Sequence, residues 1–203
     1  MASHKLLKKL HPVVAPKVAV ASMSSRQSMM DGYAKEIANH IRKNGSANLV
    51  YVCTHNSRRS QFAQLWSAHH SEMLKLPITS YSAGTEKTAC HPNVLEVLRN
   101  EGFGIESDVD NHRVVWNGNT LTTLASKTID SGDLPNEFFA IMTCSDADEN
   151  CPFIPSALGR FRLTFEDPKW SDKTNDAIKV YQETSLTISN DIKYLLQQIK
   201  QQL

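Results

Sequence analysis

A short polar segment between an apolar run and an amphipathic run constrains the fold of this chain more than any other feature. Residues 48–52 (Asn-Leu-Val-Tyr-Val) are typical of a buried strand, and the apolar residues Phe62 and Leu65 recur at helical spacing up to about residue 74. The polar segment between them runs from Cys53 to Ser60. A strand, a loop and a helix in this order favour a parallel sheet with the loop at its carboxyl edge.

The remaining apolar segments continue this alternation. We predict further strands and helices from their length, periodicity and flanking Gly or Pro residues: strands at 77–82, 137–143 and 160–164, and helices at 27–43, 92–102 and from about 172 onward. The predicted fold class is therefore α/β. We expect a three-layer sandwich with a four-stranded, mostly parallel sheet and helices on both faces.

The length and composition fit one main domain. With 203 residues, of which 40% are hydrophobic, the chain can bury a single sizeable core. We expect residues 1–26 to be a flexible N-terminal extension, 27–45 an N-terminal helix and 46–203 the domain itself. Residues 104–136 are polar and read as a long insertion, with one short helix near residues 121–127.

Charge and cysteine content exclude several classes of protein. The 22 Lys and Arg residues nearly balance the 21 Asp and Glu residues, so neither a nucleic acid nor a membrane surface is an expected partner. No apolar run approaches the length of a membrane span. The four cysteines are too unevenly spaced for a disulfide scaffold. We therefore expect a cytoplasmic protein whose cysteines serve chemistry.

The segment that begins at Cys53 has the composition of an oxyanion-binding loop. Backbone N–H groups of a tight loop and of a helix N-terminus bind tetrahedral anions, and Arg59 can add a bidentate contact. The same positive field favours a Cys53 thiolate, a nucleophile, to which Ser60 can donate a hydrogen bond. Asn56 is suited to a left-handed conformation. A buried cysteine beside two surface arginines is the alternative, which the strand–loop–helix setting disfavours. The predicted loop comprises Thr54, His55, Asn56, Ser57, Arg58, Arg59 and Ser60.

Two further sets of residues carry candidate chemistry. Cys144 follows the predicted strand 137–143, and Cys151 lies seven residues later, a spacing that suits a mobile loop able to bring two sulfurs together. No second matching pair is present, so we expect no metal site. A buried Cys144 with an incidental Cys151 is the alternative. Asp167 precedes Pro168 and, taken alone, reads as a turn or capping residue.

The sequence resembles the low-molecular-weight protein tyrosine phosphatase superfamily and, within it, the thioredoxin-coupled arsenate reductases. The resemblance runs from about Asn48 to the C-terminus. Four ordered segments carry it: Cys53 to Ser60, Tyr81-Ser-Ala-Gly-Thr85, His91-Pro-Asn93 and Phe165-Glu-Asp-Pro168.

This resemblance implies roles for the candidate residues and needs no separate cofactor. Arg59 and the loop would bind arsenate or another phosphate-type oxyanion, Cys53 would attack it, and Asp167 would act as general acid. Cys144 and Cys151-Pro152 match the reductase branch. That match implies that Cys144 attacks Cys53 and releases arsenite, that Cys151 then pairs with Cys144, and that thioredoxin or another thiol reductant reduces this bond.

Two alternatives to the reductase remain open at this stage. One is a protein tyrosine phosphatase whose phosphocysteine is hydrolysed, and the other is a non-catalytic oxyanion sensor that uses residues 104–136. The chain also departs from the family pattern at four positions: His55 replaces a common Gly, Arg58 a frequent second Cys, Gln64 a Glu that contributes to a potassium site in some reductases, and Lys169 an aromatic residue.

Overall fold

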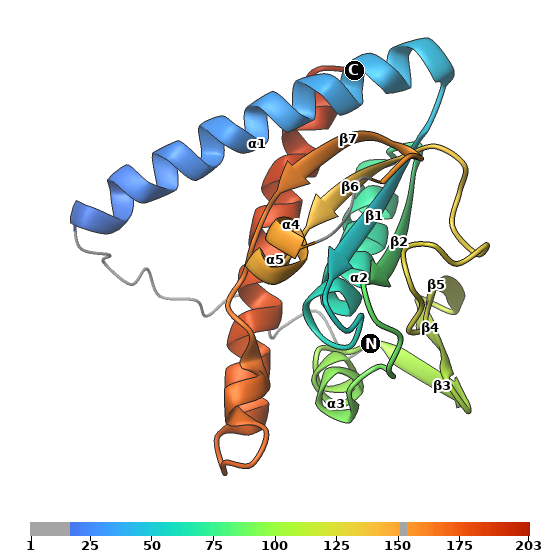
Figure 1. Cartoon of the computed structure of the whole chain (residues 1–203), viewed down its shortest axis with the longest axis vertical. Coiled ribbons are helices and arrows are strands. Elements are labelled where there is room, and N and C mark those ends of the chain that lie inside the picture. Colours follow the sequence, from blue (N-terminus) through green and yellow to red (C-terminus); the bar gives the residue numbers. More distant parts are fainter. Residues whose placement is uncertain (1–16, 151–153) are drawn as a thin grey trace.

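The computed structural model describes residues 17–150 and 154–203 (Figure 1). Residues 1–16 of the expected extension lie outside the described residues, and so does Cys151.

A four-stranded parallel sheet forms the centre of the molecule, as predicted. Its strand order is β2-β1-β6-β7, and every neighbouring pair is parallel. The strands are β1 (Ala47–Cys53), β2 (Ile78–Gly84), β6 (Phe138–Met142) and β7 (Ala157–Arg162). The last strand begins three residues earlier than the predicted 160–164. All four strands end at one edge of the sheet, where Cys53 is the final residue of β1.

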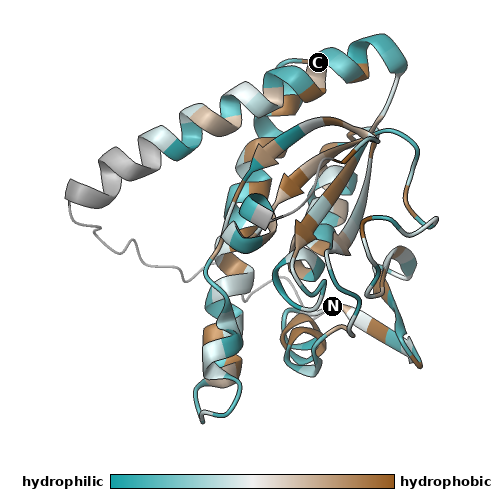
Figure 2. Cartoon of the chain, viewed as in Figure 1, coloured by the Kyte–Doolittle hydropathy of each residue, from teal (hydrophilic) through white to brown (hydrophobic). Residues whose placement is uncertain are grey.

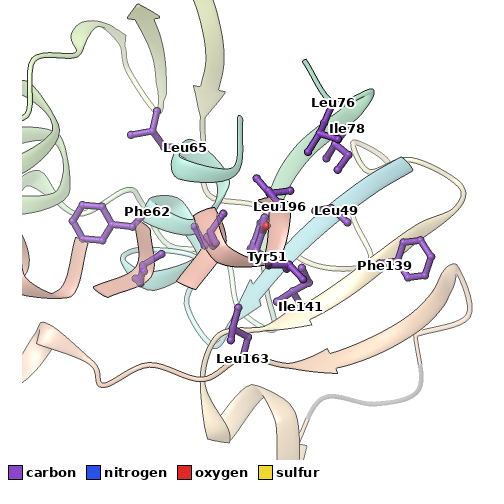
Figure 3. Packing of buried hydrophobic residues seen from close by; sticks show 14 of the residues in the cluster. Leu49, Tyr51, Phe62, Leu65, Leu76, Ile78, Phe139, Ile141, Leu163 and Leu196 are labelled. Atoms are coloured by element: carbon purple, nitrogen blue, oxygen red, sulfur yellow. The ribbon is translucent and has the colours of Figure 1, made fainter. Parts of the chain in front are cut away.

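Helices cover both faces of this sheet, which confirms the predicted fold class. The larger core receives alternate strand residues such as Leu49, Tyr51 and Ile141 (Figure 3) and lies under α1 (Lys17–Asn44), α2 (Arg59–Leu74), α3 (Pro92–Asn100) and α5 (Ala177–Gln201). Val50, Val52 and Met142 face the smaller core, which α4 (Ser145–Asn150) covers together with Ile129 and Leu134. Figure 2 shows apolar residues concentrated on the strands. Each fully buried aliphatic side chain contributes about 1.5–3 kcal/mol.

The first helix is longer than predicted. It begins at Lys17, not at residue 27, so residues 17–26, expected to be flexible, are helical. Arg26 explains part of this difference, because its Nε lies 2.8 Å from Asp191 Oδ2 on α5 and its Nη2 donates to Thr164 O at 3.0 Å. These tertiary contacts stabilise the first half of α1 where local sequence signals are weak.

The segment 104–136 contains a small sheet and not the expected helix. Three antiparallel strands, β3 (Gly104–Asp108), β4 (Asn111–Trp116) and β5 (Asn119–Leu124), form it in the order β3-β4-β5. Asn117 and Gly118 both have positive φ, 49° and 81°, as the tight turn between two antiparallel strands requires. In the sequence, the adjacent Asn117 and Gly118 were the signal for this turn. The predicted helix at 121–127 is therefore wrong.

No helix among residues 17–150 and 154–203 combines the length and the apolar composition needed to cross a bilayer.

Glu101, which follows α3, is a carboxylic acid placed among apolar groups. Its Oε2 accepts a hydrogen bond of 3.1 Å from Ser185 on α5, and Ser185 in turn accepts one of 2.9 Å from the Trp66 indole. Burial raises the pKa of Glu101 from 4.5 to about 7, and the bond from Ser185 only partly offsets this effect. The folded state therefore disfavours ionised Glu101 near neutral pH.

We expect the stability of the protein to fall between about pH 5 and about pH 8 because of Glu101. The pKa of Glu101 is higher in the folded state than in the unfolded state. Protonated Glu101 therefore contributes its full stabilisation below the unfolded pKa, and this contribution is lost as the pH rises through the folded pKa. In Glu101→Gln, the Tm should depend less on pH, by about 2 °C or more over this range. Thermal unfolding at several pH values measures this. Glu96→Gln, at an exposed position of helix α3, is the control. Parallel curves for Glu101→Gln and the unaltered protein would contradict the prediction.

Candidate active site

The sulfur of Cys53 lies at the carboxyl edge of the central sheet, at the entrance to a tight loop. Cys53 is 3% exposed and stands opposite Gly84, the last residue of β2, in the parallel register. The loop continues to Arg58, and α2 begins at Arg59. The structure thus places the predicted strand, loop and helix in the arrangement that an anion-binding loop requires.

Asn56 fixes the conformation of this loop. It is fully buried and has a φ of 46°, so the expected left-handed conformation is confirmed. Its Nδ2 donates to Ser60 Oγ at 2.8 Å, and its Oδ1 accepts from the backbone N–H of Lys127 at 2.8 Å. Gln61 Nε2 donates to the carbonyl of Asn56 at 2.7 Å. All the polar groups of the Asn56 side chain are therefore used to hold the loop.

Ser60 connects Asn56 to Cys53, the predicted nucleophile. Its Oγ lies 3.0 Å from the sulfur of Cys53. Because Asn56 already donates to this oxygen, the hydroxyl hydrogen of Ser60 is free to point at the sulfur. The chain from Asn56 through Ser60 therefore leaves a hydrogen-bond donor available to the sulfur of Cys53.

Arg59 faces the same space as Cys53 and is held from outside the loop. Its Nη1 donates to Phe165 O at 3.1 Å, and its Nη2 donates to Asp167 Oδ2 at 2.5 Å. Its Nε is buried and has no hydrogen-bond partner among the described residues. The guanidinium is thus fixed in direction by the segment after β7 while it borders the candidate cavity.

Asp167 is a capping residue, as one of its two interpretations from the sequence expected, and it also contacts Arg59. Its Oδ1 accepts from Lys169 N at 3.0 Å and so caps the short 3₁₀ helix η2 (Pro168–Ser171). Its Oδ2 makes the contact with Arg59. The cap positions the carboxylate, and the carboxylate borders the cavity above Cys53.

Cys144 is brought to the same sheet edge. It is 1% exposed, and its sulfur lies 3.5 Å from Thr54 Oγ1 and 3.3 Å from Ala147 N, the donor of a hydrogen bond. Cys53 and Cys144 also belong to the same buried cluster. The second cysteine therefore contacts Thr54, the loop residue directly after the predicted nucleophile.

The cavity at this edge is small and polar. It is lined by Cys53, His55, Ser57, Arg58, Arg59 and Asp167. At its mouth, His55 Nε2 lies 3.4 Å from Glu86 Oε2. A tetrahedral oxyanion would meet two guanidinium groups and loop N–H groups there.

A partly buried ionic cluster beside the cavity could not be predicted from the sequence. Arg58 donates to Tyr181 OH and to Asp172 Oδ2, both at 2.5 Å, and Tyr181 donates to Asp172 Oδ1 at 2.5 Å. Burial opposes the ionisation of Asp172, but the Tyr181 hydroxyl and the Arg58 guanidinium hold the pKa of Asp172 below its ordinary value. His91 Nε2 lies 3.6 Å from the same carboxylate. Arg58 thus ties the loop to α5, a contact between residues too far apart in sequence for any local pattern to indicate.

Of the remaining cysteines, Cys90 is chemically inert. Burial raises the pKa of the Cys90 thiol to about 12, so it stays protonated at neutral pH. The neighbouring His91 caps α3 by accepting from Asn93 N at 3.2 Å.

Gly84 packs directly against the oxyanion loop. A Cβ at this position would lie 2.7 Å from Thr54 O and 2.8 Å from Asn56 N. Both contacts are with backbone, which cannot rotate away. The loop conformation therefore depends on the absence of a side chain at residue 84.

We expect Gly84→Ala to weaken oxyanion binding by about tenfold or more, because displacement of the loop moves its N–H groups away from the anion. Calorimetric titration with phosphate measures this. Gly132→Ala is the matched control, since its Cβ would meet nothing within 4 Å. Equal phosphate affinity in Gly84→Ala and Gly132→Ala would contradict the assigned packing.

Comparison with solved structures agrees with this fold. A low molecular weight phosphotyrosine phosphatase from Vibrio cholerae O395 superposes with a TM-score of 0.51 at 19% sequence identity. The match covers 75% of this chain and 95% of that protein. At this identity, the similarity concerns the fold alone.

Comparison of sequences defines the family. The family described as low molecular weight phosphotyrosine protein phosphatase matches residues 48–114. An arsenate reductase from Staphylococcus saprophyticus is 31% identical over 137 residues, which cover 65% of this chain and 90% of that protein. An arsenate reductase from Staphylococcus aureus strain Newman matches at the same identity and coverage. The chain is therefore an enzyme that belongs to the low molecular weight phosphotyrosine protein phosphatase family, together with these reductases.

Proposed function

We propose that this enzyme reduces arsenate to arsenite through Cys53, Cys144 and Cys151. The observation that carries the proposal is the position of Cys144, whose sulfur lies 3.5 Å from the hydroxyl of Thr54, the residue after the nucleophile. A phosphatase of this kind needs only one cysteine, at the position of Cys53. A reductase also needs a second thiol within reach of Cys53. The relatives that are named arsenate reductases add independent support.

The first step binds and attacks the oxyanion. The loop N–H groups and Arg59 hold arsenate, and the Cys53 thiolate attacks arsenic and forms a sulfur–arsenic bond. A hydroxyl group leaves arsenic as water after taking a proton from Asp167. An incoming anion competes with Asp167 for the guanidinium of Arg59, because Nη2 contacts this carboxylate in the free enzyme.

The second step transfers two electrons. The Cys144 thiolate attacks the sulfur of Cys53, the sulfur–arsenic bond breaks, and its electron pair reduces As(V) to As(III), which leaves as arsenite. The product is a disulfide between Cys53 and Cys144. The hydrogen bond from Ala147 N to the sulfur of Cys144 supports the thiolate that this attack requires.

The third step moves the disulfide away from the loop. Cys151 attacks Cys144, frees Cys53 and leaves a disulfide that thioredoxin or another dithiol reductant then reduces. Helix α4 begins directly after Cys144. A disulfide requires Cα atoms within about 7 Å, so this step requires Cys151 to come within that distance of Cys144. Because the thiols must be reduced between turnovers, we place the enzyme in the cytoplasm.

We expect Cys144→Ser to lower thioredoxin-dependent arsenate reduction by about a hundredfold or more, because a hydroxyl cannot carry out thiol exchange. Hydrolysis of p-nitrophenyl phosphate, which needs only Cys53, Arg59 and Asp167, should stay within about twofold of the unaltered enzyme. Cys90→Ser is the matched control, since Cys90 is buried and inert. Mass mapping after arsenate treatment should find the bridge between Cys144 and Cys151.

Three results would contradict the reductase proposal in different ways. Intact arsenate reduction in Cys144→Ser would exclude the relay, and so would the absence of a bridge between Cys144 and Cys151. Absence of both activities in the unaltered protein would favour a non-catalytic oxyanion sensor.

A protein tyrosine phosphatase is the second candidate, and Trp170 favours it. This residue lies three positions after Asp167 on η2 and is 70% exposed, a position from which an indole can stack on a phenyl ring. Among the described residues, however, no Phe, Tyr or Trp lines the cavity itself.

We expect Trp170→Ala to separate the two candidates. If a phosphotyrosine peptide is the substrate, loss of ring stacking should lower kcat/KM for its hydrolysis by about two- to tenfold. Arsenate carries no ring, so arsenate reduction should be unchanged. Under the reductase proposal, peptide hydrolysis is weak in the unaltered enzyme and insensitive to Trp170. Steady-state kinetics with both substrates measures this, and the exposed Leu158, replaced by Ala, is the control.

A further inference from the structure

Lys127 lies beneath the oxyanion loop and is joined to it through the backbone. Its N–H donates to Asn56 Oδ1 at 2.8 Å, and its carbonyl accepts from Gly84 N at 2.9 Å. These two partners are the residue that fixes the loop and the glycine on which the loop packs. The position of the Lys127 backbone therefore determines whether Asn56 is oriented correctly.

The side chain of Lys127 turns back and binds carbonyl oxygens. Its Nζ donates to Ala125 O at 3.2 Å and to Ser82 O at 3.5 Å. Burial lowers the pKa of Lys127, and only the charge of Asp133 acts in the opposite direction. No carboxylate in the described part of the chain forms an ion pair with Nζ within 4.0 Å. An ammonium group in such a place is held by carbonyl dipoles, which is a costly arrangement for a residue without a role.

Lys127 lines a second pocket, which shares no lining residue with the cavity at Cys53. This pocket has a volume of about 490 Å³ and lies between α2, β2 and β5. Gln64 also lines this pocket and links β2 to β5. Its side chain accepts a hydrogen bond from Ser82 Oγ at 2.6 Å and donates one to Thr122 Oγ1 at 2.8 Å. Glu72 is the acidic residue that lines the pocket. Small cations in solution can therefore approach the place that Nζ occupies.

We infer that the Lys127 ammonium group is a positioning group for the nucleophile. By binding the carbonyls of Ala125 and Ser82, it holds the segment that follows β5 against strand β2. In this way it aligns the Lys127 N–H with Asn56. Asn56 then orients Ser60, and Ser60 stabilises the Cys53 thiolate. The inference rests on the proposed function only in that Cys53 is the nucleophile.

The reactivity of Cys53 tests this inference without arsenate or thioredoxin. In Lys127→Met, the rate of iodoacetamide alkylation of Cys53 at about pH 6 should fall about tenfold, which corresponds to the loss of about one hydrogen bond to the thiolate. The rate at high pH, where Cys53 is fully ionised in either protein, should be unchanged. Mass spectrometry of the Cys53 peptide measures the rates across pH. Arg58, Arg59, His55 and Asp167 face Cys53 and are present in every variant.

Chemical rescue and a matched control separate positioning from general stability. In Lys127→Ala, methylammonium chloride should restore most of the lost rate by entering through the pocket, while an equal concentration of sodium chloride should not. Lys87→Met, at an exposed position, should behave as the unaltered protein does. An alkylation profile of Lys127→Met that coincides with the unaltered one would overturn the inference, and so would an equal loss at every pH. Failure of arsenate reduction in the unaltered enzyme would overturn the proposed function instead and leave these profiles unaffected.

Discussion

The hydrogen bond between Ser60 and Cys53 is the interaction on which the rest of the site depends. At 3.0 Å it joins the end of β1 to the first turn of α2, and it can point the right way only because Asn56 supplies the second hydrogen bond to Ser60. Asn56 in turn needs a left-handed backbone and a partner for its Oδ1. A single polar contact at the predicted nucleophile thus depends on the conformation of the entire loop.

The central sheet and the loop were predictable because their signals are local. Apolar runs of strand length and the spacing from Cys53 to Arg59 are properties of adjacent residues, and the structure has the strands within a few positions of the predicted ones. The contacts of Asp172 and Lys127 were not predictable, because they join residues 114 and 71 positions apart from their partners in the loop. The hairpin at Asn117-Gly118 had a local signal, and the polar composition around it concealed it.

The proposed function implies that two chemistries can share one family fold. Under that proposal, binding of the oxyanion and attack by Cys53 would use residues at the end of β1, whereas the electron transfer would use Cys144, which follows the neighbouring strand β6. Parallel strands bring both ends to the same edge. A second thiol at this position would then add redox chemistry without any change to the anion-binding loop.

The contacts of helix α1 bear on where the functional unit of the chain begins. Arg26 contacts Thr164 O, and its guanidinium stacks 5.1 Å from the ring of Phe165, whose carbonyl holds Arg59. The segment that presents Asp167 is therefore braced by a helix that lies before residues 48–114, which match the family. The frame that holds Arg59 and Asp167 in place thus extends towards the N-terminus, beyond those matched residues.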